Sequence, residues 1–346
     1  MKKILVTGSE GYIGSVLMPI LIDNGFTVVG LDNCYFSNSN LNNSKFPKYK
    51  IIKKDIRDID LNDFKYKNYF AIVHLAALCN DSLGMIDDDL TYDINYKSSV
   101  KLAKLAKSSG IKRFVFASSC SLYGHGGSEP LDENCQSNPQ TPYGRSKILA
   151  ENDISRLSSN KFSPVFLRNA TAFGFSPRMR FDIVVNNLVG YAKVDNEIKI
   201  LGDGKPWRPL VHVRDICKAI VTVLKVKRKI IHNHAFNVGN DDENYQIKTI
   251  AQKVKNFYPG CNITIATKNS EDKRDYNVSF NKLTKDLKFS TAWSLIMGIE
   301  ELKNYYDAIS LNEKVFFSKD YIRLKKINYL IHNKYIDNNL RWLKNE

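Results

Sequence analysis

The chain has 346 residues, of which 43% are hydrophobic and 25% are charged, so its length and composition predict one large globular domain or two. Its six cysteines form no C-x-x-C pair and no cluster with histidine, which argues against a disulfide framework or a metal site and favours a reducing, cytoplasmic compartment. No stretch approaches the roughly 18 apolar residues that a membrane helix needs, so a membrane-spanning protein is excluded.

The chain is strongly basic, with 51 Lys and Arg residues against 36 Asp and Glu and a net charge of +15. Such a balance is compatible with nucleic acid, an anionic substrate or a membrane surface as a partner. The basic residues are scattered rather than gathered in one segment, and no nucleic-acid motif is present. A general preference for Lys and Asn explains the charge as well, so nucleic acid is not expected as a partner.

In the first half of the chain, short apolar runs alternate with segments that resemble helices, such as Val16–Asn24, which Gly25 ends. This alternation predicts an α/β fold of the Rossmann type, a parallel, doubly wound sheet with helices on both faces. The expected strands are Lys3–Thr7, Thr27–Leu31, Ile51–Lys53, Ala71–Leu75 and Phe114–Ala117.

The second half has a different texture, because glycines and prolines interrupt the alternation from about Ser176. Strand-like runs return at Ile198–Leu201 and Ala235–Val238, which predicts a smaller lobe whose chain crosses back into the first domain. The expected division is a Rossmann domain over 1–175, with later segments returning to it, a smaller substrate-binding lobe over 176–312, and a basic helical extension beyond the main fold over 313–346.

The first expected strand runs into three glycines, Gly8, Gly11 and Gly14, and then into a helix. Glycines there let the backbone turn tightly and approach a pyrophosphate, whose charge lies at the helix N-terminus. Asp32 follows at the end of the next strand, where a carboxylate accepts both ribose hydroxyls and repels a 2′-phosphate. The pattern favours NAD over NADP; the alternatives are glycines that merely cap a helix and an Asp in a surface turn.

The order of these motifs over residues 1–305 resembles the extended short-chain dehydrogenase/reductases of the nucleotide-sugar epimerase/dehydratase family. The segment His74–Ala77 is similar to the family's fourth strand, and Asp55 and Ile56 are similar to its adenine-contacting pair. Phe236–Gly239 resembles a late strand of the substrate lobe. The resemblance implies NAD as cofactor, and the cofactor-binding residues that it implies are Gly8, Gly11, Tyr12, Ile13, Gly14, Asp32, Asn33, Asp55, Ile56, Leu75, Ala76, Ala77, Asn95, Tyr143 and Lys147.

The candidate catalytic residues are Ser119, Tyr143 and Lys147. Tyr143 and Lys147 are one helical turn apart and share a face, so the ammonium can lower the pKa of the phenol toward the range of a general base. The phenolate then takes a hydroxyl proton while hydride leaves the same carbon for NAD, and Ser119 holds the sugar oxygen. A solvated helix face is the alternative, which the preceding Ser-rich strand end and the glycine loop make less favourable.

The two residues after Ser119 discriminate among reactions. The family's 4,6-dehydratases have an Asp-Glu pair there, whereas this chain has Cys120 and Ser121, so elimination of water lacks its usual acid and base. Relatives that epimerise beside a keto group often have Cys at the position of Ser121. Cys120 is displaced from that pattern by one residue, and a buried structural thiol is the preferred interpretation.

Substrate binding is expected from the second half, where arginines suit a diphosphate because a guanidinium can bind two oxygens at once. Arg208 and Arg274, the latter in the segment 272–276, resemble family diphosphate contacts that converge from opposite walls. Arg178 is a further candidate, and His212 is interpreted as a polar core residue. The substrate-binding residues implied by the resemblance are Ser119, Thr171, Arg180, Asn187, Arg208 and Arg274.

Together these patterns predict an NAD-dependent enzyme that oxidises a ring carbon of a nucleoside-diphosphate sugar, most simply C4, through a transient ketone. A 4-epimerase is favoured; a C4 dehydrogenase or a 4-keto reductase would use the same residues. A rival of another class is a catalytically silent NAD-binding protein that holds RNA, against which the intact Ser119, Tyr143 and Lys147 speak. A homodimer is expected, and the nucleotide and the sugar stay open.

Overall fold

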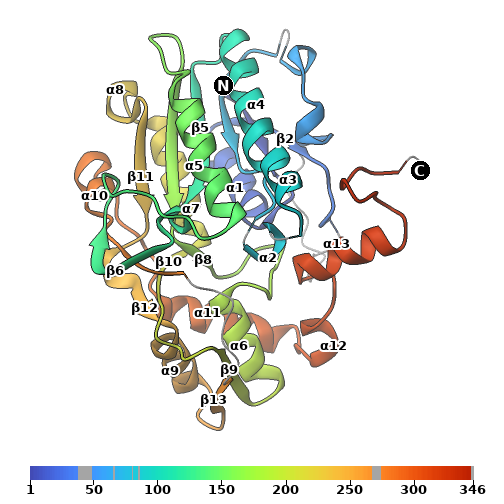
Figure 1. Ribbon diagram of the computed structural model, residues 1–346, viewed down its shortest axis with the longest axis vertical. Helices are drawn as coiled ribbons and strands as arrows, with labels where there is room; N and C mark the ends of the chain where they lie inside the picture. Colours follow the sequence, from blue (N-terminus) through green and yellow to red (C-terminus); the bar gives the residue numbers. More distant parts are fainter. Residues whose placement is uncertain (38–48, 65–66, 80, 85, 267–273, 344–346) are drawn as a thin grey trace.

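A seven-stranded parallel sheet forms the centre of the larger part of the protein in a computed structural model, which describes residues 1–37, 49–64, 67–79, 81–84, 86–266 and 274–343 (Figure 1). The strand order β11-β7-β5-β4-β1-β2-β3 confirms the predicted Rossmann-type sheet. Its strands are β1 (Lys3–Thr7), β2 (Thr27–Asp32), β3 (Lys50–Lys53), β4 (Tyr69–His74), β5 (Arg113–Ser119), β7 (Ser163–Asn169) and β11 (His234–Val238).

The alternating side chains of β1 explain why helices cover both faces of this sheet. Ile4 and Val6 are buried in one core with helices α1 (Tyr12–Asp23) and α7 (Val213–Lys225). Leu5 points to the opposite face and is buried in a second core with α4 (Ser98–Ser108) and α5 (Pro142–Ser155). Shorter helical segments on this domain are α2 (Asp81–Gly84), α3 (Asp88–Thr91), the π-helical turn Tyr92–Lys97, α8 (Arg228–Ile231) and α10 (Asn281–Leu287).

The strand order reverses between β1 and β4, and such a switch point places a ligand cleft at the carboxyl ends of the strands. The two strand ends are tied together, since the Thr7 hydroxyl lies 2.6 Å from Nδ1 of His74 and the backbone N of Leu75 donates to the Thr7 carbonyl at 3.0 Å. Burial lowers the pKa of His74 to about 3, so this histidine is a neutral structural link. The fold thus directs attention to the loops that follow β1, β2, β4 and β5.

The smaller lobe lies below the sheet in Figure 1 and has its own core, in which Phe181 packs on Phe316 and Tyr306. It contains a three-stranded sheet in the order β12-β10-β8 and the parallel pair β13-β9. Its elements are β8 (Thr171–Phe173), α6 (Val184–Val194), β9 (Glu197–Leu201), β10 (Trp207–His212), β12 (Asn244–Gln246), α9 (Ile247–Phe257), β13 (Asn262–Ala266), α11 (Leu295–Ala308) and α12 (Glu313–Phe316).

The strand β11 lies in the seven-stranded sheet of the first domain, and this position corrects one assignment. Phe236–Gly239 was expected to be a late strand of the substrate lobe, but Phe236 pairs with Leu167 of β7 at the edge of the seven-stranded sheet. An apolar run does not specify which sheet it joins, and here Phe236 and Val238 complete the core of the larger domain. The run Ile198–Leu201 instead stays in the small lobe as β9. A further parallel pair, β6 (His125–Leu131) with β14 (Asp275–Val278), connects the two parts.

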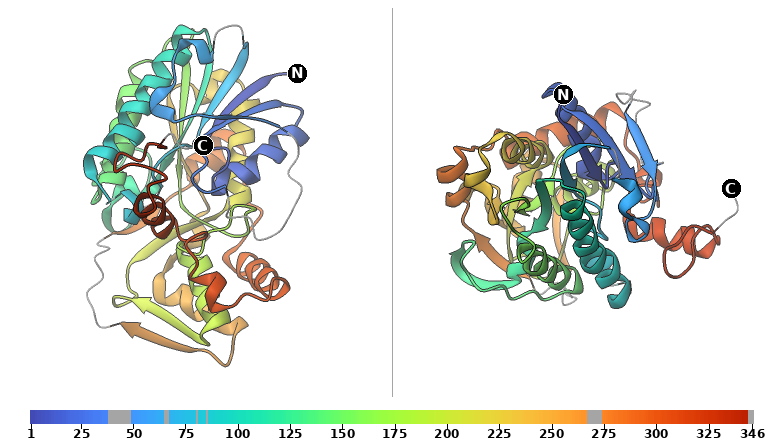
Figure 2. Two further views of the ribbon diagram at one scale, coloured as in Figure 1. Left: turned by 90° about the vertical axis from the view of Figure 1, so that its right-hand side faces the viewer. Right: turned by 90° about the horizontal axis from the view of Figure 1, so that it is seen from above.

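The C-terminal segment was expected to lie beyond the main fold, which is wrong. After α12, the helix α13 (Arg323–His332) and the residues to 343 pack against the larger domain beside α2 and the N-terminal strands (Figures 1 and 2). Ile327, Leu330 and Leu340 are buried in the same core as Leu5, so this segment is part of the main fold. Across the described ranges, no helix has the length and apolarity to cross a membrane.

Candidate active site

The glycine loop after β1 brings two backbones into contact. Gly8 has a φ of +73°, and a Cβ atom there would lie 2.7 Å from the backbone N of Ala76 in the segment after β4. A Cβ atom on Gly14 would lie 2.2 Å from the carbonyl oxygen of Gly8. The loop therefore requires glycine at both positions, and it leaves the N-terminus of α1 open toward the pocket at the switch point.

Asp32 ends β2 beside this loop. Its two carboxylate oxygens accept hydrogen bonds from the backbone N of Glu10 at 2.9 Å and of Cys34 at 2.8 Å. Burial raises the pKa of Asp32, and these two backbone hydrogen bonds oppose the rise. Because an ionised carboxylate can accept about four hydrogen bonds, the oriented side chain keeps acceptor capacity for ribose hydroxyls.

One pocket of about 260 Å³ collects almost all the proposed cofactor residues. Asn95 is the exception among them: its side chain accepts from the backbone N of Leu78 at 2.8 Å and donates to the Leu78 carbonyl at 3.1 Å, so it holds the segment after β4 from behind. The proposed site residues that line the pocket are Gly8, Gly11, Tyr12, Ile13, Gly14, Asp32, Asn33, Asp55, Ile56, Leu75, Ala76, Ala77, Ser119, Tyr143, Lys147, Thr171, Arg180 and Arg274.

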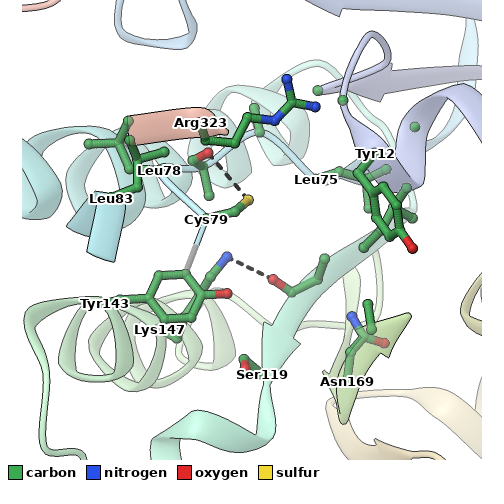
Figure 3. Close-up of a pocket in the computed structure, with 18 of the residues that line it drawn as sticks. Tyr12, Leu75, Leu78, Cys79, Leu83, Ser119, Tyr143, Lys147, Asn169 and Arg323 are labelled. Carbon is green, nitrogen blue, oxygen red and sulfur yellow. Dashed lines mark hydrogen bonds between the residues drawn. The ribbon is translucent and has the colours of Figure 1, made fainter. Parts of the chain in front are cut away.

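Tyr143 and Lys147 project from the first turns of α5 into one side of this pocket (Figure 3). Thr141 fixes the start of the helix by accepting from the backbone N of Gly144 at 3.2 Å. The Lys147 ammonium donates to the Ala117 carbonyl at 2.8 Å and lies 5.7 Å from the centre of the Tyr143 ring. Burial lowers the pKa of Lys147 because it disfavours the charged form, and the same low dielectric strengthens the effect of the ammonium on the nearby phenol.

Ser119 ends β5 on the same side of the pocket and accepts a hydrogen bond from the backbone N of Ser121 at 3.2 Å. Three further pocket-lining side chains have polar atoms that are buried without a hydrogen-bond partner among the described residues: Oγ of Ser118, Oγ of Ser121 and Oδ1 of Asn169. Unsatisfied buried polar atoms are costly, so this wall is suited to a ligand rich in hydroxyl groups. Of this group, the sequence indicated only Ser119. Ser118 and Ser121 are close to Ser119 in the sequence, and Asn169 is its partner on the neighbouring strand β7.

Cys120 and His212 are both buried, in line with the preferred interpretation of Cys120 as a structural thiol and of His212 as a polar core residue. The Cys120 thiol is 1% exposed, points away from the pocket and donates to the Arg168 carbonyl at 3.1 Å, while burial raises its pKa. Such a thiol is a poor acid or nucleophile. His212 stacks on Trp293 at 4.1 Å between ring centres and lies 2.9 Å from a carboxylate oxygen of Glu301.

Asn187 and Arg208, two of the proposed substrate contacts, are not among the described residues that line the pocket. Asn187 donates to the Phe181 carbonyl at 2.9 Å, and Arg208 donates to the carbonyl of Trp207 at 2.8 Å and to that of Arg274 at 2.7 Å. Arg208 therefore buttresses the segment that presents Arg274. Asp272 and Lys273, which belong to the same predicted motif, lie outside the described residues.

Arg178 and Arg180 each form a buried ion pair beside the glycine loop. Arg178 contacts Glu10 at 2.5 Å, and Arg180 contacts Asp182 at 2.7 Å. The Arg180 charge lowers the pKa of Asp182, and Asp182 raises the pKa of Arg180. The pair therefore stays ionised despite its burial.

The sequence of this site matches a known family. The NAD-dependent epimerase/dehydratase family matches residues 4–239, which include the glycine loop, Asp32, Ser119, Tyr143 and Lys147. The chain belongs to this family. Its cofactor is therefore NAD, and as a member of the NAD-dependent epimerase/dehydratases it is an enzyme.

Individual relatives agree with this assignment. The chain is 32% identical over 246 residues to a putative UDP-glucose 4-epimerase of Methanocaldococcus jannaschii, an alignment that covers 69% of this chain and 77% of the relative. Its fold is similar to that of the UDP-glucose 4-epimerase of Thermotoga maritima, solved with UDP-glucose, with a TM-score of 0.78, 22% identity and coverage of 89% and 100%. It is also similar to the UDP-glucuronic acid 4-epimerase of Bacillus cereus, solved with UDP-glucuronic acid and NAD, with a TM-score of 0.75, 24% identity and coverage of 89% and 99%.

The pocket of this epimerase/dehydratase fits NAD by its own geometry. The backbone approach at Gly8 and Gly14 leaves room for a diphosphate at the start of α1, and Asp32 stands beside it with spare acceptor capacity. One charged wall residue, Arg323 of α13, was not predicted from the sequence; it lies outside the matched range and lines the pocket opposite Tyr143 (Figure 3). No local motif marks it, because it is a single Arg in a basic segment.

Proposed function

We propose that the protein is an NAD-dependent 4-epimerase of a UDP-linked sugar. The observation that carries the proposal is the convergence of Ser119, Tyr143 and Lys147 on one wall of the NAD pocket, beside unsatisfied polar atoms that suit a sugar. The names of the Methanocaldococcus and Thermotoga relatives support the reaction and the nucleotide. Cys120 and Ser121 in place of an acid-base pair speak against elimination of water.

In the proposed mechanism Tyr143 is the proton acceptor for the C4 hydroxyl of the sugar. The Lys147 ammonium, held by the Ala117 carbonyl, stabilises the phenolate, and Ser119 donates a hydrogen bond to the C4 oxygen. NAD, when bound, supplies reversible acceptance of hydride. Tyr143 keeps the proton until the C4 oxygen takes it back.

Epimerisation requires the 4-keto sugar to present both faces within one pocket. The unsatisfied atoms of Ser118, Ser121 and Asn169 offer hydrogen bonds to more than one orientation of the ring, which supports an epimerase over a one-way dehydrogenase. Arg274, backed by Arg208, is the proposed diphosphate contact that keeps the nucleotide anchored while the sugar turns. Binding energy at this remote group positions the reacting carbon.

The test is to incubate the purified protein, without added NAD, with UDP-glucose, UDP-galactose and their N-acetylated and uronic-acid counterparts, and to identify products by proton NMR. GDP- and dTDP-glucose serve as nucleotide controls. We expect a UDP-sugar to reach equilibrium with its C4 epimer with no net formation of NADH. Accumulation of a keto sugar or an acid, with stoichiometric NADH, would establish a dehydrogenase instead, and Tyr143→Phe provides the inactive control.

Two further predictions belong to this proposal. The homodimer and the cytoplasmic location expected from the sequence stay predictions, which a light-scattering mass and cell fractionation would test.

A further inference from the structure

Arg323, the first residue of α13, places a buried cation in the wall of the NAD pocket. Its side chain is 3% exposed, and its backbone N donates to Asp182 at 3.0 Å. The guanidinium carbon lies 4.0 Å from the centre of the Phe36 ring, which supports one face of the plane. Figure 3 shows the side chain extending over the pocket on the side opposite Tyr143 and Ser119.

Both terminal nitrogens of Arg323 are buried without a hydrogen-bond partner in the described part of the chain. The two neighbouring carboxylates do not bond to these nitrogens: Asp182 accepts from Arg180 and from the Arg323 backbone, and Asp32 accepts from the Glu10 and Cys34 backbone. An ionised guanidinium that is removed from water and lacks acceptors is strongly unfavourable. The arrangement is therefore suited to binding an anion.

The pKa of Arg323 and the contacts of Arg180 also favour a bound anion at this place. Burial, aided by the charge of Arg180, lowers the pKa of Arg323 to about 9, although Asp182, Cys79 and Asp32 act in the opposite direction. Arg180 also has a buried nitrogen, Nη2, without a partner in the described ranges. The two arginines thus present unpartnered nitrogen donors on one side of the pocket, where a bound anion would accept hydrogen bonds.

The position of Arg323 indicates which anion this is. Its charge interacts with that of Asp32, which is hydrogen-bonded to the glycine loop through Glu10. The proposed contact for the substrate's diphosphate, Arg274, belongs instead to the segment that Arg208 supports. We propose that the Arg323 guanidinium binds the diphosphate of NAD, so that a residue outside the family-matched range completes the cofactor site.

This inference rests on the NAD dependence of the family and not on the identity of the sugar. A fork of two N–H donors matches the paired oxygens of a diphosphate, and a hydrogen bond to a charged group typically changes affinity by about 10- to 150-fold. Because the cation is unsatisfied without ligand, its removal should not destabilise the protein without NAD. Removal of an arginine that has only a structural role would instead lower the stability of the protein without NAD.

The experiment compares full-length wild type, Arg323→Met, Arg323→Lys and Lys325→Met after removal of NAD. Lys325 is a matched control, since it lies on the same helix, carries the same charge and is exposed. NAD, NADP and UDP are titrated by calorimetry, adenosine by NMR, and the melting temperature of each ligand-free protein is recorded. Binding is the readout, so the outcome does not depend on whether the epimerase assignment holds.

We expect Arg323→Met to weaken NAD binding by about 10- to 150-fold, with adenosine binding and the ligand-free melting temperature preserved. Arg323→Lys should recover part of the loss, and Lys325→Met should bind NAD as wild type does. Unchanged NAD affinity, or an equal loss for adenosine, would overturn the proposal. A loss confined to UDP or to NADP would also overturn it, by assigning Arg323 to the substrate's diphosphate or to a 2′-phosphate.

Discussion

The two walls of the pocket are built in different ways. On one wall Ser119, Tyr143 and Lys147 come from one short stretch of chain, the end of β5 and the start of α5. The opposite wall depends on contacts between residues that are far apart: the Tyr35 hydroxyl donates to the Leu340 carbonyl across 305 positions, and Trp342 donates to the Asn33 carbonyl across 309. The wall proposed for proton transfer is thus local in sequence, whereas the wall proposed for cofactor binding is a product of tertiary packing.

The C-terminal residues brace that second wall at the proposed adenosine end. Arg57 is held between Asp55, at 2.7 Å, and the Asn339 carbonyl, at 2.8 Å. Hydrogen bonding to Arg57 lowers the pKa of Asp55 despite its burial, so the carboxylate stays charged and fixed. Mutations on the local wall should therefore lower turnover, and mutations on the packed wall should weaken NAD binding.

The strongest test of this contrast is Tyr143→Phe on the local wall. Loss of the hydroxyl removes the proposed proton acceptor and little else, so turnover should fall by about 100-fold or more while NAD affinity stays within a few-fold of wild type. Steady-state rates and calorimetric titration of NAD measure the two effects separately. Near-normal turnover would remove Tyr143 from the chemistry.

Asp32→Ala tests the proposed role of Asp32 in the preference for NAD over NADP. Without the carboxylate, the 2′-phosphate is no longer repelled and the ribose hydroxyls lose an acceptor, so the preference for NAD over NADP should shrink by about tenfold or more. Dissociation constants for both dinucleotides, measured on wild type and variant, give the ratio directly. A wild type that binds both equally well would contradict the assigned role.

Trp342→Phe tests the packed wall alone. It removes the donor to the Asn33 carbonyl but keeps an aromatic ring against Tyr35, whose ring centre lies 5.6 Å away. The loss of one neutral hydrogen bond should weaken NAD binding by about fivefold and leave the turnover of saturated enzyme unchanged. A fall in turnover at saturating NAD would show that the two walls are not separable.

Lys147→Met should give the smallest effect, on stability without NAD. Because the pKa of Lys147 in the folded protein lies below its ordinary value near 10.4, the unfolded chain binds more protons between these two values. The stability of wild type relative to Lys147→Met should therefore rise as the pH increases through that window. Denaturant unfolding at pH 7 and pH 10 measures the change, and a constant difference would mean that burial of the ammonium is fully compensated.

The contrast also explains what the sequence could predict. Local spacing was sufficient for the glycine loop, Asp32 and the Tyr143–Lys147 pair, because each depends on one turn or one strand end. It failed for Arg208 and Asn187, whose side chains bond to backbone carbonyls that only the folded lobe brings near. Arg323 could not be predicted, because its proposed role depends on its burial against Phe36 and on terminal nitrogens that no described residue satisfies.

The distribution of these walls along the chain has a consequence for biosynthesis. The glycine loop, Asp32 and the Tyr143–Lys147 pair are synthesised before residue 150, while Arg323 and Trp342 are synthesised only after the whole of the seven-stranded sheet. A product that stops before α13 would contain every strand of the seven-stranded sheet and every proposed proton-transfer residue, yet lack the far wall of the cofactor site. Retention of NAD would then report that translation had passed α13.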